Sequence, residues 1–275
     1  MTFWICAVEE WTLAVRSRQL IIFATIFGTL ALVVASSGYV LTGGTGLQDF
    51  SRTAASLVEL VLLLVPLASL VVGVSALTPD AGAAELLYSQ PVSRRTILAG
   101  KLVGLFLALV TAQTLGFGAS GLVLFWRTGA TGVGGFAGVM VAGAALTAVF
   151  LAIAAAVAGG ATSRGRARAL AVSLVIWLVA VALFDVAILG ASSWLSSGAA
   201  SRLMMTGAIA NPVGAVRTGV MLALDGTAAF GAASLAFLRF THGASGAAAW
   251  LAASVVLWVI APFAVAVARL NRADV

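Results

Sequence analysis

The sequence predicts an all-α polytopic membrane protein with one membrane domain over residues 1–275. Apolar residues make up 62% of the chain and charged residues only 9%, unlike the composition of a soluble domain. Apolar runs of roughly 20 residues, long enough to cross a bilayer core as a helix, recur along the chain. Basic residues fall between these runs rather than on one face, so no nucleic-acid binding is expected despite the formal net charge of +6.

The first segment, residues 1–19, predicts a helix that lies in the membrane interface. Trp4, Val8, Trp11 and Val15 recur at helical spacing on one face, and charged residues lie elsewhere around the helix. An apolar face that carries tryptophan, opposite a charged face, is typical of a helix lying in the plane of the interface.

Six membrane-spanning helices are expected to follow. By length and hydropathy they cover about residues 20–41, 56–77, 102–126, 134–158, 170–191 and 247–268. Gly134, Gly138 and Ala142 form a row of small residues that would let a neighbouring helix approach closely. Packing within the chain is the favoured interpretation of this row, and a seam between two copies is the alternative.

Residues 78–101 form the most polar connection in the chain. They predict a short helix over residues 81–89, which ends before Pro91 because proline disfavours helix at the preceding residue. Ser93 is expected to cap the next helix. A compact charged segment between two spans could dock a soluble partner, or it could only orient the protein in the bilayer. The residues alone leave both interpretations open.

Residues 192–246 form a long, moderately apolar connection that proline and glycine interrupt. Its pieces are too short to span, so we expect re-entrant or interfacial helices there, with Asn211 as cap and Pro212 in the first turn of one of them. A seventh span over residues 221–240 is the less favoured alternative, because it would place the basic C-terminal tail outside.

The distribution of basic residues predicts the orientation. With six spans, both termini lie on the same side of the membrane. Lys and Arg are in excess on that side, so we expect it to be the cytoplasmic side, with the protein in the inner membrane of the cell. The expected inner set is Arg16, Arg18, Arg94, Arg95, Lys101, Arg164, Arg166, Arg168, Arg269 and Arg272. The expected outer set is Arg52, Arg127, Arg202, Arg217 and Arg239.

Two carboxylates, Glu59 and Asp185, lie inside predicted spans, both near the outer surface in this topology. Intramembrane carboxylates are costly and are therefore candidates for function. They could line an outward vestibule or hold an outer gate. The favoured interpretation is that they pair with Arg217 or Arg202 of the outer connection, because buried charges are usually paired.

No phosphate-binding G-x-x-x-x-G-K-[ST] loop occurs, so any ATP hydrolysis must be supplied by another polypeptide. Ser120, in a Gly-Ala-Ser-Gly match, with His242 as the one available imidazole, resembles the rhomboid intramembrane serine proteases. This is the weakest of the alternatives, because His242 falls in a loop and nucleophile and base must meet within hydrogen-bond reach. With Cys6 as the single cysteine, no metal site is expected.

Residues 91–104, PVSRRTILAGKLVG, resemble the permease subunits of ABC exporters of the second structural class. In that family a short apolar helix, a proline and a basic residue precede an Ile/Leu-x-Gly-Lys motif that opens the third span. More narrowly, the chain resembles the permease of nitrous-oxide-reductase maturation transporters. The further matching features are the interfacial helix, Pro66 in the second span, Trp177 before Phe184-Asp185, and Asn211-Pro212 before Arg217.

The resemblance implies a permease that pairs with a second copy of itself and docks a cytoplasmic ABC ATPase dimer, which holds ATP and Mg. The implied coupling residues are Glu85, Leu86, Leu87, Tyr88, Pro91, Arg94 and Lys101, and the candidates for an outer gate or pathway are Asp185, Glu59, Asn211 and Arg217. The outer connection would meet a periplasmic copper-handling protein during copper-site assembly in nitrous oxide reductase. A lipid or drug exporter, and a scaffold that transmits ATPase motion without passing a substrate, remain open.

Overall fold

The computed structural model describes residues 2–41, 48–78, 92–128, 133–159, 165–225 and 232–272, and every element within these ranges is helical. The helices are α1 (Thr2–Val15), α2 (Arg18–Leu41), α3 (Gln48–Leu77), α5 (Arg94–Thr128), α6 (Val133–Ala158), α7 (Arg166–Leu178), the π-helical segment η3 (Val179–Leu183), α8 (Phe184–Ser192), α9 (Ser197–Ala210), α10 (Pro212–Asp225), α11 (Ala232–Phe240) and α12 (Ala244–Arg272).

The polytopic all-α prediction is confirmed, and each expected span lies inside α2, α3, α5, α6, the continuous α7–η3–α8 rod, or α12. Among the described residues, five helices are long and apolar enough to cross a membrane, and up to seven spans result if each bent helix pair is one span. These pairs are α1 with α2, bent by 64°, and α9 with α10, bent by 100°. The count of six therefore stays a prediction.

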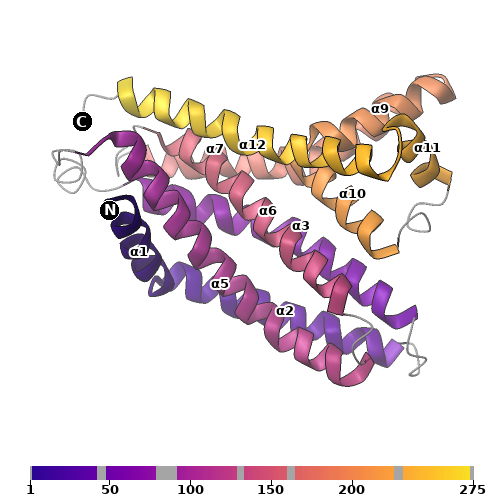
Figure 1. Ribbon diagram of the computed structural model, residues 1–275, viewed down its shortest axis with the longest axis horizontal. Coiled ribbons are helices and arrows are strands. Elements are labelled where there is room, and N and C mark those ends of the chain that lie inside the picture. Colours follow the sequence, from indigo (N-terminus) through magenta and orange to yellow (C-terminus); the bar gives the residue numbers. More distant parts are fainter. Residues whose placement is uncertain are drawn as a thin grey trace.

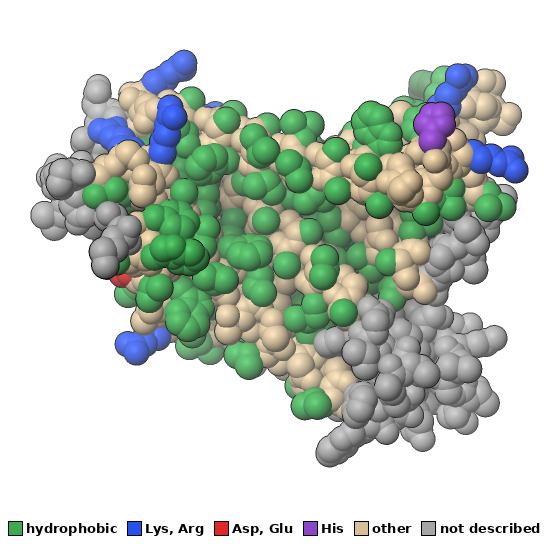
Figure 2. Space-filling model, viewed as in Figure 1, with side chains coloured by type: hydrophobic (Ala, Val, Ile, Leu, Met, Phe, Trp, Pro, Cys, Tyr) green, Lys and Arg blue, Asp and Glu red, His purple; other side chains and the backbone are tan. Residues whose placement is uncertain are grey.

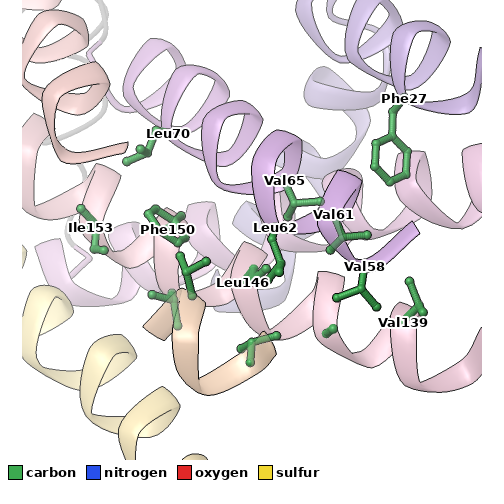
Figure 3. Close-up of a cluster of buried hydrophobic side chains, with 14 of the residues drawn as sticks. Phe27, Val58, Val61, Leu62, Val65, Leu70, Val139, Leu146, Phe150 and Ile153 are labelled. Carbon is green, nitrogen blue, oxygen red and sulfur yellow. The ribbon is translucent and has the colours of Figure 1, made fainter. Parts of the chain in front are cut away.

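Helices α3 and α6 form the centre of the bundle. In their most apolar stretches, 56% of the residues of α3 and 67% of those of α6 are buried, whereas only 6% are buried in the corresponding stretch of α7, η3 and α8. Figure 3 shows the cluster between them, in which Val61, Leu62 and Leu146 interdigitate, with Phe27 of α2 and Phe150 of α6 completing it. Because lipid is as apolar as these side chains, close packing rather than exclusion from water holds such helices together.

A buried polar pair joins α5 to α6 inside this apolar bundle. The Nε2 atom of Gln113 donates a hydrogen bond to Oγ1 of Thr147 at 2.6 Å, and Thr147 donates to the carbonyl oxygen of Gly143 at 2.8 Å. Gln113 and Thr147 are both buried. An interhelical hydrogen bond in an apolar medium fixes the register of two helices, which apolar contacts alone specify weakly.

Both termini lie at the same end of the bundle, which we call the terminal end (Figure 1). Three arginines bind carbonyl groups at helix C-termini there: Arg94 binds Leu270 of α12 at 2.7 Å, Arg166 binds Thr78 beyond α3 at 2.6 Å, and Arg269 binds Ala156 of α6 at 2.8 Å. The last carbonyls of a helix have no partner within the helix, and a cation near them also favours the helix dipole.

These contacts place several members of the predicted inner set of basic residues at one end of the molecule. In the view of Figure 2, Lys and Arg side chains lie at the two ends of the long axis, and hydrophobic side chains cover the band between them. This arrangement is what a bilayer requires, because the charged groups then reach the two polar interfaces.

Helix α1 turns its small residues inward and its large apolar residues outward. Ala7 and Ala14 are buried, whereas Trp4, Val8 and Trp11 are exposed. The predicted apolar face is therefore free to contact lipid, as expected of an interfacial helix.

The connection over residues 192–246 contains the separate helices α9 (Ser197–Ala210), α10 (Pro212–Asp225) and α11 (Ala232–Phe240). α10 ends at Asp225 and α11 has 9 residues, too few to span alone, and residues 226–231 lie outside the described part. At the sharp bend, Ser254 and Trp258 of α12 donate hydrogen bonds to the carbonyls of Ile209 and Ala210 at the end of α9, at 2.5 and 2.9 Å. These bonds satisfy carbonyls left without a partner within the helix.

The row of small residues in the fourth predicted span, Gly134, Gly138 and Ala142, was expected to pack closely against another helix, and the structure contradicts this at Gly138. A Cβ atom added at Gly138 would meet no described atom within 4 Å, so none of the described helices approaches closely there. Close packing within the chain, the favoured interpretation, is therefore wrong at Gly138, although Ala142 is buried. The neighbouring Gly143 is the tight position of α6, since a Cβ there would lie 2.5 Å from Oε1 of Gln113.

Candidate functional site

The predicted coupling helix over residues 81–89 lies outside the described residues. The same holds for the coupling candidates Glu85, Leu86, Leu87, Tyr88 and Pro91, which remain predictions. The chain resumes at Val92, and the expected cap is confirmed: the backbone N–H of Thr96 donates to Oγ of Ser93 at 3.2 Å, and α5 begins at Arg94.

The two described coupling candidates tie the first turns of α5 to other helices. Arg94 bonds the carbonyl of Leu270 near the end of α12. Lys101 forms an ion pair with Glu10 of α1 at 3.0 Å, and the two side chains are only 19% and 10% exposed. A displacement of the start of α5 would therefore be transmitted directly to α1 and α12 through these two contacts.

The contact between α1 and α5 depends on two glycines that flank Lys101. A Cβ atom at Gly104 would collide with the carbonyl oxygen of Ala7 and come within 2.9 Å of the backbone nitrogen of Trp11. A Cβ at Gly100 would lie 2.8 Å from Cβ of Cys6. Residues 100–104, Gly-Lys-Leu-Val-Gly, are thus the surface on which α1 docks.

Glu10 is the residue of this site that the sequence analysis did not single out. A signal was present, because Ala7 and Ala14 lie three and four residues from it and mark the small-residue face of α1. A charged residue on the buried small-residue face, rather than on the solvent face, predicts a charged partner across the contact.

At the opposite end, Arg217 of α10 joins the two intramembrane carboxylates. Its Nη1 atom lies 2.6 Å from Oδ2 of Asp185, and its Nε atom lies 3.5 Å from Oε1 of Glu59, an ion-pair distance without hydrogen-bond geometry. The side chains of Arg217 and Asp185 are 28% and 37% exposed, whereas that of Glu59 is 57% exposed. The favoured pairing with Arg217 is confirmed.

The Arg217 cluster, defined as Arg217 with Asp185 and Glu59, lies one bilayer thickness from the terminal end. Each carboxylate is nineteen residues along its helix from the contact between Thr78 and Arg166, roughly 28 Å at about 1.5 Å per residue. A bilayer core is about 30 Å thick. If that contact lies at one interface, the cluster lies near the other.

Asn211 connects the corner between α9 and α10 to the π-helical segment of the fifth rod. Its Oδ1 accepts a hydrogen bond from the backbone N–H of Val213 at 3.1 Å, which confirms it as the cap of α10. Its Nδ2 donates to the carbonyl of Ala180 in η3 at 2.7 Å, and its side chain is buried. Single π-helical turns within α-helices frequently occur at functional sites. Asn211 therefore holds α10, and with it Arg217, at a fixed place beside η3 and α8.

Ser120 and His242 do not form a catalytic pair. Ser120 is buried and donates to the carbonyl of Phe117 in its own helix at 2.9 Å. His242 is exposed in the turn between α11 and α12, and no hydrogen bond of the described residues joins the two. The described residues also contain no cluster of three His, Cys, Asp or Glu side chains that could hold a metal ion.

Comparison with protein families decides the class of this architecture. A family model described as ABC-2 family transporter protein matches residues 7–275. The chain belongs to this family. It is therefore a multi-pass permease subunit of an ABC transporter, which confirms the resemblance drawn from residues 91–104 and leaves the serine-protease alternative without support.

Two curated proteins within the ABC permeases are similar to this chain in sequence. A probable ABC transporter permease protein NosY of Pseudomonas aeruginosa is 32% identical over 270 residues, which cover 96% of this chain and 95% of the relative. A protein of the same name from Stutzerimonas stutzeri is 30% identical over 200 residues, which cover 68% of this chain and 69% of the relative. This ABC-2 permease is thus similar to NosY over nearly its whole length.

Proposed function

We propose that this ABC-2 permease couples a separate cytoplasmic ATPase dimer to export, or to the action of a periplasmic partner. The observation that carries the proposal is the pair of contacts that Arg94 and Lys101 make with α12 and α1 directly after residues 79–91. An ATPase that displaces this segment would move α5 and, through those contacts, two further helices.

The opposite end of the bundle would receive this movement at the Arg217 cluster. α3 and α7 are joined at the terminal end by Arg166 and Thr78, and near mid-helix by the indole N–H of Trp177, which donates to the carbonyl of Leu63 at 3.0 Å. At the far end, the side chain of Arg217 links Glu59 of α3 to Asp185 of α8. A relative shift of α3 and α8 would thus open or close an ion-paired gate.

A second copy of the chain completes the proposed permease. One face of α7 carries Ala167, Ala171, Leu174, Val175 and Leu178, all of them exposed, and the face continues with exposed apolar residues on α8. α7 is otherwise packed against α3 and α6. This face fits a copy of itself about a two-fold axis, the commonest symmetry of oligomers.

The cellular role we propose follows from the similarity to NosY together with the sequence resemblance to maturation transporters. In this role the permease lies in the inner membrane with both termini in the cytoplasm, and the α9–α11 region faces a periplasmic copper-handling protein. The process served is assembly of the copper site of nitrous oxide reductase.

The coupling proposal predicts that the purified chain hydrolyses no ATP and that co-expression with its ATPase gives a stable complex. Glu85→Arg or Leu86→Arg should weaken that complex, because a bulky cation then replaces the acidic or apolar contact of the coupling helix. Co-purification and ATPase rate are the measurements, and Arg239→Gln at the opposite end is the control. An unaltered complex with an unaltered ATPase rate in both coupling variants would refute the assignment of residues 81–89.

The orientation predicts opposite labelling of Ser163 and Ser197. In a Cys6→Ser background, a cysteine at 197 should react with an impermeant thiol reagent added to intact cells from the periplasmic side, and a cysteine at 163 should not. The excess of basic residues at the terminal end is the physical reason. Permeabilised cells, in which both positions react, provide the control, and the reverse pattern in intact cells would overturn the orientation.

A further inference from the structure

A groove runs along the surface of the bundle between α7 and α12, with α6 beneath it. Its volume is about 1000 Å³. α6 contributes Ile153 and Val157, α7 contributes Val172 and Ile176, and α12 contributes Leu257 among other apolar residues. The groove therefore has apolar walls and is large enough for a substantial ligand, since ligand pockets are typically about 300–1,000 Å³.

The groove has the length of one membrane leaflet. Along α12 it reaches from Arg269 to Leu257, twelve residues or roughly 18 Å at about 1.5 Å per residue. Half of a bilayer core of about 30 Å is close to this length. The end of the groove farther from the chain termini is lined by Trp258, whose indole N–H donates a hydrogen bond to the carbonyl of Ala210.

Three features that favour an anion meet at the other end of the groove, which opens at the terminal end of the bundle. Arg168 lines this mouth and is exposed, and it makes no ion pair or hydrogen bond with the described residues. Arg269 also lines it and uses Nη1 on the carbonyl of Ala156, which leaves its other nitrogen atoms available. Gly165, the N-cap of α7, has no side chain to cap the first N–H groups of the helix. Unpartnered N–H groups at a helix N-terminus bind phosphate readily.

We propose that this groove holds one anionic phospholipid of the leaflet at the terminal end. Its phosphate binds Arg168, Arg269 and the N-terminus of α7, and its acyl chains lie along the apolar walls as far as Trp258. Basic pockets between transmembrane helices recognise anionic lipid headgroups in this way. The lipid would fill the space between α7 and α12 and so support α7, which is otherwise held mainly by α3 and α6.

The groove is distinct from the face proposed to bind the second copy. Along the α7 helix, Arg168, Val172 and Ile176 follow one another at intervals of four residues and form one stripe, whereas Ala171, Leu174 and Leu178 lie on another. Lipid binding at the groove involves neither the ATPase nor the coupling segment. A test of lipid binding is therefore independent of a test of the proposed function.

Native mass spectrometry of the purified full chain tests the site with phosphatidylglycerol and with phosphatidylcholine of the same acyl chains. We expect one tightly held phosphatidylglycerol per chain and weaker retention of phosphatidylcholine. Arg168→Gln should weaken phosphatidylglycerol binding about tenfold, because a hydrogen-bonded charge pair is lost. Arg202→Gln, an exposed arginine whose hydrogen bond is to its own helix, is the matched control and should bind like the parent chain.

Further variants separate the possible occupants of the groove. Val172→Trp fills it and should release the lipid without changing the charge, and Arg269→Gln should add to the loss in Arg168→Gln. Inorganic phosphate at millimolar concentration should not displace the lipid. Phosphate binding without lipid, or equal retention of the two lipids in parent and Arg168→Gln chains, would overturn the proposal.

Cross-linking addresses a second copy as the alternative occupant. In a Cys6→Ser background, a cysteine at Leu174 should form disulfides between copies and a cysteine at Val172 should not. Efficient cross-linking through position 172 would show that the groove is an interface and would overturn the lipid assignment. Absence of cross-linking at both positions, with phosphatidylglycerol retained, would support the lipid site and count against the proposed dimer face.

Discussion

Replacing Gly104 with leucine is expected to detach α1 from α5. A Cβ at this position collides with the backbone of α1 at Ala7 and approaches Trp11 to 2.9 Å, and backbone atoms cannot yield as a flexible side chain would. Overpacking alone typically costs about 1–3 kcal/mol. Separation of the helices would also break the pair between Lys101 and Glu10, whose rupture adds to this cost because both side chains are largely buried.

The melting temperature of the detergent-purified chain and the rate of proteolysis within α1 measure the effect. Gly118→Leu is the matched control, since Gly118 lies on the same helix and a Cβ there meets no atom within 4 Å. Gly104→Leu should melt well below Gly118→Leu and be cleaved faster in α1. Equal melting temperatures and equal cleavage would contradict the docking role of this motif.

Removing the charge of Arg217 is expected to destabilise the opposite end of the bundle, because two carboxylates are then left beside each other without a cation. A hydrogen bond to a charged group contributes about 1.5–3 kcal/mol, and partial exposure of these side chains places the effect at the lower end. Thermal melting of Arg217→Gln measures it, with Arg202→Gln as the control. In the double variant Arg217→Gln/Asp185→Asn the loss should be smaller than the sum of the single losses, as coupling through a direct contact requires.

The variants of Asp185 separate a structural pair from a gate. If the ion pair only holds α8 and α10 together, Asp185→Asn and Asp185→Ala should both lower thermal stability and assembly with the ATPase. If it gates the far end, Asp185→Asn should assemble normally but lose the transport or maturation activity that the proposed function assigns to the complex. Full stability and full maturation in both variants would remove Asp185 from the functional residues.

The positions of the spans could be read from the sequence because the bilayer itself sets their length. A run of roughly 20 apolar residues has few alternatives to a helix in lipid, where each backbone polar group must be bonded within the segment. Local capping was equally readable: Ser93 and Asn211 begin helices because their side-chain oxygens accept backbone N–H bonds two or three residues ahead. The cost of an unpaired charge also predicted that Asp185 pairs with Arg217 or Arg202, and the structure selected Arg217.

Only the tertiary structure decided which helices touch and through which residues. Lys101 was expected in the coupling surface, and its described partner is Glu10 of the first helix; Gly138 was expected at a close contact and meets nothing. The groove that ends at Arg168 and Arg269 has no signature in the order of its residues, which come from three separate helices. Lipid and protein side chains are similarly apolar, so hydropathy says which segments enter the membrane but not which face of each meets a neighbour; shape complementarity and a few polar contacts settle that.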